Sequence, residues 1–192
     1  MLAIIKYGHP GLRQVAVRVA EITPEIQQLA AHLIETMHTA HGVGLAAEQV
    51  NRALQMFVID VRDVKDRPSW LERDGLQVEV AAFMPMVLIN PEVKPYGPPA
   101  TGPEGCLSFP ELFAEITRPE ATEVTATNEH GETTSFRCGG LLARAIQHEY
   151  DHLRGVLFID RMSAEIKRGL RAELDQLQAD TRAALAQARR SG

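Results

Sequence analysis

An apolar stripe at helical spacing lies in the first quarter of the chain. Its members recur three or four residues apart and are Ile26, Leu29, Leu33, Ile34 and Met37. Thr23 precedes the stripe and Pro24 opens it, as is common at helix N-termini. We therefore expect a helix from Pro24 to 39–41. The lead-in over 6–20 is expected to be mostly extended, with a turn at 8–11.

Shorter apolar runs, of the kind that form strands, fill the middle of the chain. We expect strands at 55–61, 78–83, 86–90, 113–117, 121–127 and 132–137. The charged stretch 62–77 contains Pro68 and Gly75 and is expected to be a surface excursion. Residues 94–103 are rich in proline and glycine, which predicts a loop.

Two further helices are expected towards the C-terminus. The first follows Gly139-Gly140 and ends at Gly155, and its apolar stripe is Leu141, Leu142, Ala145 and Ile146. A strand-like run at 156–159 separates it from a long helix at about 163–190, which Ser163 caps. The apolar seam of the long helix is Ile166, Leu170, Leu174 and Leu177. Because no repeat or linker interrupts the chain, we expect one α+β domain over 1–192.

Composition narrows the classes of function. The 192 residues carry a net charge of −5, which argues against a dedicated nucleic-acid binder, because such proteins usually have a basic surface. Two cysteines are too few for a secreted disulfide scaffold of this length. The apolar start ends at Lys6, too early for a signal-peptide core, and no later run could span a bilayer. We expect a soluble, cytoplasmic protein with no membrane partner.

The strongest chemical signal lies on the first of the two C-terminal helices, where residues 148–152 read His-Glu-x-x-His. Residues four apart on a helix lie one turn above each other, with Cβ atoms about 5–6 Å apart. His148 and His152 can therefore direct two imidazoles at one metal ion, while Glu149 reaches water bound to that ion. The apolar surroundings favour a metal site over solvated histidines.

A catalytic metal site of this kind needs a third protein ligand. Cys106 is the better candidate, because it lies in a glycine-containing turn and a thiolate binds borderline-soft divalent metals well. A free cysteine is more often a small buried apolar residue, and that is the role expected of Cys138. Glu165 and Glu173 follow on the long helix, where we expect solvated carboxylates.

Three segments together resemble the motifs of one enzyme family. They are Gly-x-Gly-Leu-Ala-Ala-x-Gln at 42–49, Glu-Gly-Cys-Leu-Ser at 104–108 and Gln-His-Glu-x-Asp-His-Leu at 147–153. In this order they are similar to the three motifs of peptide deformylase, and the likeness of the frame extends from Tyr7 to Asp160. Three motifs in one order are far more specific than any one of them.

The resemblance implies removal of the N-formyl group from the initiator methionine of nascent polypeptides, with release of formate. It implies Fe²⁺ as the native metal, with Zn²⁺ or Ni²⁺ as substitutes. By position, the family's metal ligands fall on Cys106, His148 and His152. The implied fold is a deformylase-like domain of mostly antiparallel sheets around a central metal-binding helix.

The resemblance also assigns roles around the metal. Metal-bound hydroxide would attack the formyl carbon, with Glu149 as the general acid/base. The Gln49 side chain and the Leu107 backbone N–H would stabilise the negative charge on the formyl oxygen. The apolar residues nearby could form a pocket for the methionine side chain, or they could belong to the ordinary hydrophobic core. The candidate substrate-binding residues are Gly42, Val43, Gly44, Leu141 and Ala145.

Three departures from the family pattern bear on substrate preference. Glu48 stands where many members have proline or another uncharged residue, and an exposed glutamate there would add negative charge to the cleft. Phe113 stands where some relatives carry arginine. The stretch 62–85 is longer than in compact members.

Rival readings of the same residues remain. A metallopeptidase would also use His-Glu-x-x-His, and a purely structural metal site would need a fourth ligand such as Cys138 or His130. The C-terminal helix holds six basic and four acidic residues over 163–192, so a transient ribosome contact is a further expectation.

Overall fold

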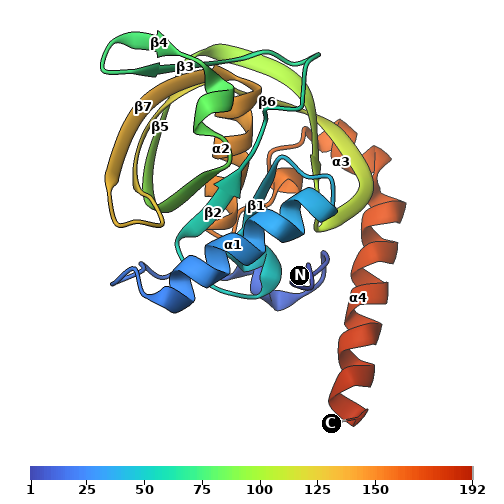
Figure 1. Ribbon diagram of the computed structural model, residues 1–192. Coiled ribbons are helices and arrows are strands. Elements are labelled where there is room, and N and C mark those ends of the chain that lie inside the picture. Colours follow the sequence, from blue (N-terminus) through green and yellow to red (C-terminus); the bar gives the residue numbers. More distant parts are fainter. Residues whose placement is uncertain (192) are drawn as a thin grey trace.

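One curved sheet surrounds a central helix in the computed structural model, which describes residues 1–191; Gly192, the end of the predicted domain, lies outside the described residues. The strands pair antiparallel in the order β1-β2-β5-β6-β7-β3-β4. Figure 1 shows the sheet wrapping around helix α2 (Leu141–His152), which agrees with the predicted α+β class. The strands are β1 Gly44–Ala46, β2 Met56–Ile59, β3 Ser69–Arg73, β4 Leu76–Val78, β5 Met86–Cys106, β6 Phe109–Thr127 and β7 Thr133–Gly140.

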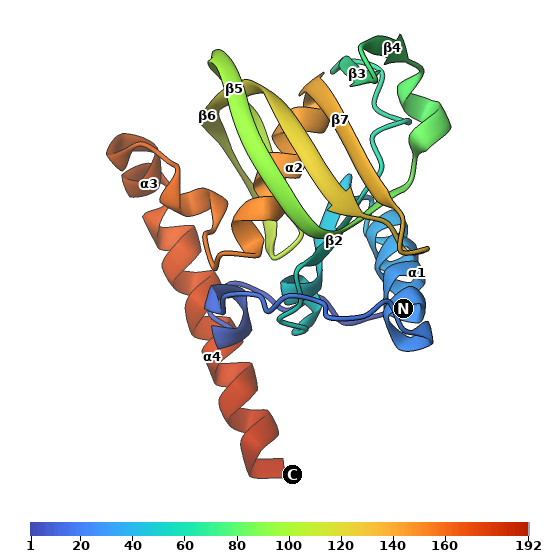
Figure 2. The same cartoon turned by 90° about the vertical axis from the view of Figure 1, so that its left-hand side faces the viewer.

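Helix α1 (Pro24–Thr39) has the bounds that its apolar stripe predicts and packs on β1 and β2. Leu33 and Met37 of the stripe are fully buried in that interface. Helices α3 (Ala164–Gly169) and α4 (Arg171–Ser191) lie well apart from α1, as Figure 2 shows. No helix among the described residues has an apolar stretch long enough to cross a membrane.

The largest difference from the sequence prediction is at residues 94–103, which are strand rather than loop. They belong to β5, which pairs with β6 along almost its whole length, with bulges near Tyr96 and Gly105. Proline is excluded from central strands because it lacks an N–H. Here β2 pairs with β5 only at Met86–Ile89, so the rest of β5 has a strand on one side only and tolerates its prolines. The strands expected at 113–117 and 121–127 are likewise one strand, β6.

The predicted strand at 78–83 is also wrong. Only Leu76–Val78 is strand, and Val80–Phe83 is a 3₁₀ turn whose Val80 and Phe83 pack against the core as one face. A short apolar run fits a strand and a helical turn about equally well, so its pattern does not decide between them. The expected surface excursion contains the hairpin of β3 and β4, which pairs with β7.

Two predictions near the C-terminus need correction. The run at 156–159 is not a strand, because Phe158–Asp160 forms a 3₁₀ turn in which the Asp160 carboxylate accepts from the Leu157 N–H at 2.9 Å. Ser163 caps a helix as expected, its hydroxyl accepting from the Ile166 N–H at 3.2 Å. That helix ends at Gly169, however, and α4 continues as a separate helix whose far end projects from the body in Figure 1.

Candidate metal centre

A thiol from the tip of the β5–β6 hairpin meets two imidazoles of α2. Ligand atoms of Cys106, His148 and His152 all lie within 4.8 Å of one another. The Cys106 Sγ is 3.4 Å from the His152 Nε2, and the two imidazole rings are 5.1 Å apart. One turn of α2 sets the spacing of the histidines, and the two-residue tip at 107–108 brings the thiol to them.

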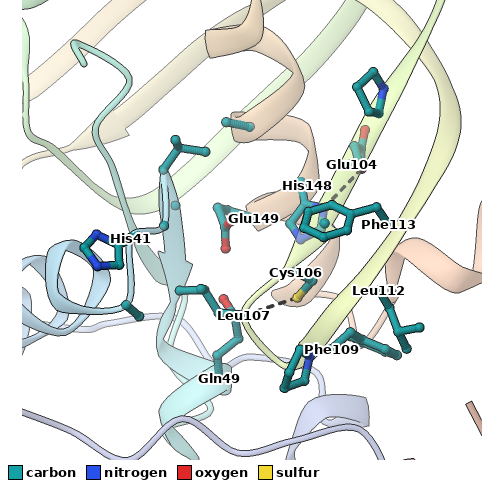
Figure 3. Close-up of a pocket in the computed structure, with 18 of the residues that line it drawn as sticks. His41, Gln49, Glu104, Cys106, Leu107, Phe109, Leu112, Phe113, His148 and Glu149 are labelled. Carbon is teal, nitrogen blue, oxygen red and sulfur yellow. Dashed lines mark hydrogen bonds and ion pairs between the residues drawn. The ribbon is translucent and has the colours of Figure 1, made fainter. Parts of the chain in front are cut away.

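A carboxylate behind the site fixes the orientation of His148. Its Nδ1 donates to the Glu104 Oε2 at 3.1 Å, as the dashed line in Figure 3 marks. This hydrogen bond leaves the Nε2 lone pair for a metal, in the carboxylate–histidine arrangement common around metal ligands. Glu104 lies two residues before Cys106, so one strand supplies both the thiol and the orienting carboxylate.

The buried charges of this region form a network around Arg118 of β6. The Arg118 guanidinium donates to Glu104 at 2.6 and 2.9 Å and to Asp151 at 2.8 Å. Burial raises the pKa of the Glu104 carboxyl, but hydrogen bonds from His148 and Arg118 outweigh it and hold that pKa well below its usual range. Arg161 adds two hydrogen bonds to Asp151 at 2.6 Å. The network keeps Glu104 ionised beneath the metal ligands.

Sequence reasoning missed this network. Glu104 and Asp151 stand inside two of the three motifs, and that position was the only signal that could have drawn attention to them. Arg118 lies 14 residues after Glu104 and 33 before Asp151, with no motif of its own. The pairing of β6 with β5 and the packing of α2 on β6 together place it between the two carboxylates.

Glu149 faces the cleft beside the ligand cluster. Its side chain is buried, its Oε2 has no hydrogen-bond partner among the described residues, and burial raises its pKa to about 7. A Cβ on Gly44 would collide with the Glu149 carboxylate and would lie 2.9 Å from its Cγ. A side chain at position 44 would therefore displace the Glu149 carboxylate, because β1 passes directly over it.

The Gln49 amide has a defined orientation. Its Oε1 accepts from the Ala46 N–H at 2.9 Å, so the Nε2 faces the hairpin tip, 3.4 Å from the Cys106 Sγ and 3.3 Å from the Ser108 Oγ. Leu107 lies next to it at the tip, and a Cβ on Gly42 would come within 2.7 Å of the Leu107 Cδ1. The first and second motifs thus meet across the site.

A cleft of about 510 Å³ opens in front of these groups. Figure 3 shows Glu149, Cys106 and Leu107 facing it. The sequence-predicted residues that line it are Gly42, Val43, Gly44, Gln49, Cys106, Leu107, Leu141, Ala145, His148 and Glu149. His152 is not among the lining residues; it lies behind the thiol and is fully buried.

A family model for polypeptide deformylase matches residues 1–168. The chain belongs to the polypeptide deformylase family. A peptide deformylase of Opitutus terrae is 40% identical over 185 residues, which cover 95% of this chain and 96% of the relative. Peptide deformylases are metal enzymes that remove the N-formyl group from nascent peptides.

Solved deformylase structures have the same fold. The crystal structure from Thermus thermophilus superposes with a TM-score of 0.79 at 32% identity, covering 94% of this chain and 99% of the other. The structure from Synechococcus elongatus, in complex with actinonin, gives a TM-score of 0.74 at 37% identity and covers 93% of this chain and 86% of that one.

The other ligand candidates lie away from the deformylase site. Among the described residues, the cluster that could hold a metal contains Cys106, His148 and His152 and neither Cys138 nor His130. Cys138 is fully buried in an apolar cluster, and burial raises the pKa of its thiol well above the usual value. His130 is exposed at the turn before β7. Glu165 and Glu173 are exposed on α3 and α4.

Two departures from the deformylase pattern lie close to the site. An effect of Glu48 on the charge of the cleft would require an exposed side chain, but Glu48 is only 1% exposed. Neither of its carboxylate oxygens has a hydrogen-bond partner among the described residues. Burial raises its pKa to about 8. Phe113 is 68% exposed and lines the cleft, with its ring against Gly105.

Proposed function

We propose that this chain removes the formyl group from the initiator methionine of nascent polypeptides and releases formate. The observation that carries the proposal is the Glu149 carboxylate, buried and without a partner on Oε2, at the cleft wall beside Cys106 and the two histidines. A structural metal site would leave no role for such a group. The cleft also gives a peptide access to it.

Cys106, His148 and His152 fit a divalent metal. One thiolate and two neutral imidazoles suit borderline ions such as Fe²⁺, Zn²⁺ or Ni²⁺, and we propose Fe²⁺ as the native ion. Three protein ligands leave a coordination position open for chemistry. When bound, the ion supplies water of lowered pKa, near 7 for zinc-bound water in proteins, and polarises a carbonyl. Glu104 would hold His148 in the ligating tautomer.

The remaining steps fall to side chains of this chain. Glu149 accepts the proton of the attacking water and returns it to the leaving amine, so one carboxylate acts twice. The Gln49 Nε2 and the Leu107 N–H donate to the formyl oxygen as it gains negative charge. The Gln49 amide is already oriented for this by the hydrogen bond from the Ala46 N–H.

The apolar part of the cleft would bind the methionine side chain. Val43 comes from the segment before β1, while Leu141 and Ala145 lie four residues apart on one face of α2. Gly42 and Gly44 let that wall approach the Leu107 and Glu149 side chains closely, because a Cβ at either position would collide with them. Phe113 lines the cleft at the position where some relatives carry arginine, so it would offer the peptide an apolar contact instead of a polar one.

Formate release tests the proposal directly. We expect anaerobically purified protein with one divalent metal per chain to release formate from formyl-Met-Ala-Ser and to leave acetyl-Met-Ala-Ser intact. Iron-loaded protein should lose activity in air while nickel-loaded protein keeps it. Cleavage of the Met-Ala bond without formate would instead establish a metallopeptidase. A metal-replete protein that does neither would refute the catalytic assignment.

We also place this activity in the cytoplasm, where nascent chains emerge, and propose a transient ribosome contact through α4. Support comes from the projecting end of the helix, where Arg182, Arg189 and Arg190 are exposed. Basic residues of this kind attract the phosphate backbone of RNA.

A further inference from the structure

The N-terminal segment 5–7 is tied to both proposed oxyanion donors. The Ile5 N–H donates to the Gln49 carbonyl at 2.8 Å, and the Tyr7 N–H donates to the Ser108 carbonyl at 2.9 Å. Between them, the Lys6 Nζ donates to the Leu107 carbonyl at 2.8 Å. One short segment thus contacts the backbone of the Gln49 turn and of the hairpin tip.

Lys6 stands out within this segment because its side chain reaches the site. It is half-buried and lines the cleft together with Gln49 and Leu107. Its side-chain contact at the tip is a backbone carbonyl rather than a carboxylate. A hydrogen bond from an ammonium group is shorter and roughly twice as strong as a neutral one. It therefore suits the task of fixing a peptide group in one orientation.

We propose that Lys6 is a positioning residue for the deformylation reaction: by holding the Leu107 carbonyl, it fixes the direction of the Leu107 N–H. The inference rests on the proposed function, since that function makes the N–H an oxyanion donor. The N–H of Leu107 lies in the 106–107 peptide plane and its carbonyl in the 107–108 plane, so the two planes turn separately about φ and ψ of Leu107. The coupling between them comes from the short tip that joins two paired residues.

Only two residues, Leu107 and Ser108, connect the paired residues Cys106 and Phe109. With the Leu107 and Ser108 carbonyls both held, the tip has little freedom to turn its N–H away. A donor that is already oriented costs no reorganisation when charge develops on the formyl oxygen. Lys6 would therefore act on turnover and not on substrate binding.

Lys6→Met tests the proposal, because methionine keeps the length of the stem and removes the donor. Removing an oxyanion donor outright costs about 10²–10³-fold in kcat, so misdirecting one should cost about 10-fold, with KM within about twofold. Lys6→Arg keeps a charged donor and should restore kcat to within about threefold of wild type. Metal content should be unchanged in both variants.

Lys65→Met is the matched control. The Lys65 Nζ donates to the Arg62 carbonyl at 2.7 Å, the same kind of bond on an exposed turn, and Lys65 does not line the cleft. It should leave kcat and KM unchanged. A wild-type kcat in Lys6→Met, a Lys6→Arg enzyme as slow as Lys6→Met, or a loss of metal that accounts for the loss of rate would each overturn the proposal.

A second measurement does not depend on turnover. In the zinc-loaded protein, the amide NMR signal of Leu107 should shift in Lys6→Met, return towards the wild-type position in Lys6→Arg and stay in place in Lys65→Met. An unmoved signal in Lys6→Met would overturn the positioning role. Absence of formate release from the wild type would instead refute the proposed function, and the two failures are thereby distinguished.

Discussion

Helices α2 and α4 lie only 18 residues apart in sequence but place their polar side chains in different surroundings. In α2 the polar residues Gln147, His148, Glu149, Asp151 and His152 are all buried. In α4 the charged residues are exposed, and Leu174 is its buried apolar anchor. The shorter helix, α2, contains the residues of the proposed chemistry, whereas the longer helix, α4, presents its charged residues to solvent.

The difference lies in what stabilises each helix. A buried polar group costs free energy unless it is paired, so α2 depends on partners from distant strands, above all Glu104 and Arg118. An exposed charged residue needs no such partner, so α4 is held by Leu174 and Leu177, which pack on the apolar cluster that includes Phe109 and Phe158. The proposed metal ligands of α2 therefore lie in the helix whose buried polar side chains pair with residues of distant strands. Five changes test this contrast.

The largest loss of activity is expected from substitution of Cys106, the thiol that faces α2. Cys106→Ser should lose tight metal binding and fall to the activity of the metal-free protein, because a serine hydroxyl is not deprotonated at neutral pH and binds soft metals poorly. Cys138→Ser is the control: it places a hydroxyl in the apolar core, costing about 1–3 kcal/mol of stability, but should keep its metal. Metal analysis and formate release check both. The reverse pattern would refute the ligand assignment.

Glu149→Gln removes the proposed proton acceptor and nearly preserves its shape. General acid–base catalysis contributes about 10²–10⁴-fold, and because one residue acts twice we expect a loss towards the upper end, with full metal content. Formate release and metal stoichiometry on one sample provide the test. Turnover close to wild type would exclude Glu149 from the mechanism.

Arg118→Met should show how far α2 depends on its partners. Removing one member of a buried ion pair costs about 3–5 kcal/mol, because the remaining carboxylates stay buried and unpaired. Arg137 is the matched control, since it also lies near two glutamates but at 3.7 Å and exposed. Arg137→Met should cost less than about 1 kcal/mol in urea unfolding. If Arg118→Met does not fold, Arg118→Lys should show a smaller loss of the same sign.

Glu48→Gln should change how stability depends on pH. Burial favours the protonated form in the fold, with a pKa of about 8 against 4.5 for the ordinary side chain. The contribution of protonated Glu48 to stability is therefore complete below pH 4.5 and is lost as the pH rises through about 8, by on the order of 5 kcal/mol in all. The variant should lack this loss between pH 5 and 9. Glu115→Gln, on an exposed position of β6, should retain it.

Truncation after Ala179 should have the smallest effect. It removes the exposed end of α4, including Arg182, Arg189 and Arg190, and keeps Leu174. We expect kcat/KM on formyl-Met-Ala-Ser to stay within about twofold, because surface substitutions away from the core change stability by only about 0.5 kcal/mol. Ribosome association in a sedimentation assay should weaken. Unchanged sedimentation would leave the end of α4 as an ordinary solvated helix.

Local patterns in the sequence were sufficient for part of this protein. The apolar stripes determined α1 and the first turns of α2, because helical periodicity is a local property. The spacing of His148 and His152 determined that both imidazoles share one face, since four residues make about one turn. The order of the three motifs carried the family assignment and the ligand set that the structure brings together.

The tertiary structure alone decided the rest. Residues 94–103 are strand because β6 pairs with them, although their prolines predict a loop. Glu48 is buried because β1 and the following turn fold inward, which its charge does not predict. Arg118 lies between Glu104 and Asp151 only because β6 pairs with β5 and α2 packs on β6, which brings together residues far apart in the chain. Local propensity cannot encode such contacts, because the free energy of a buried charge depends on which distant residues surround it.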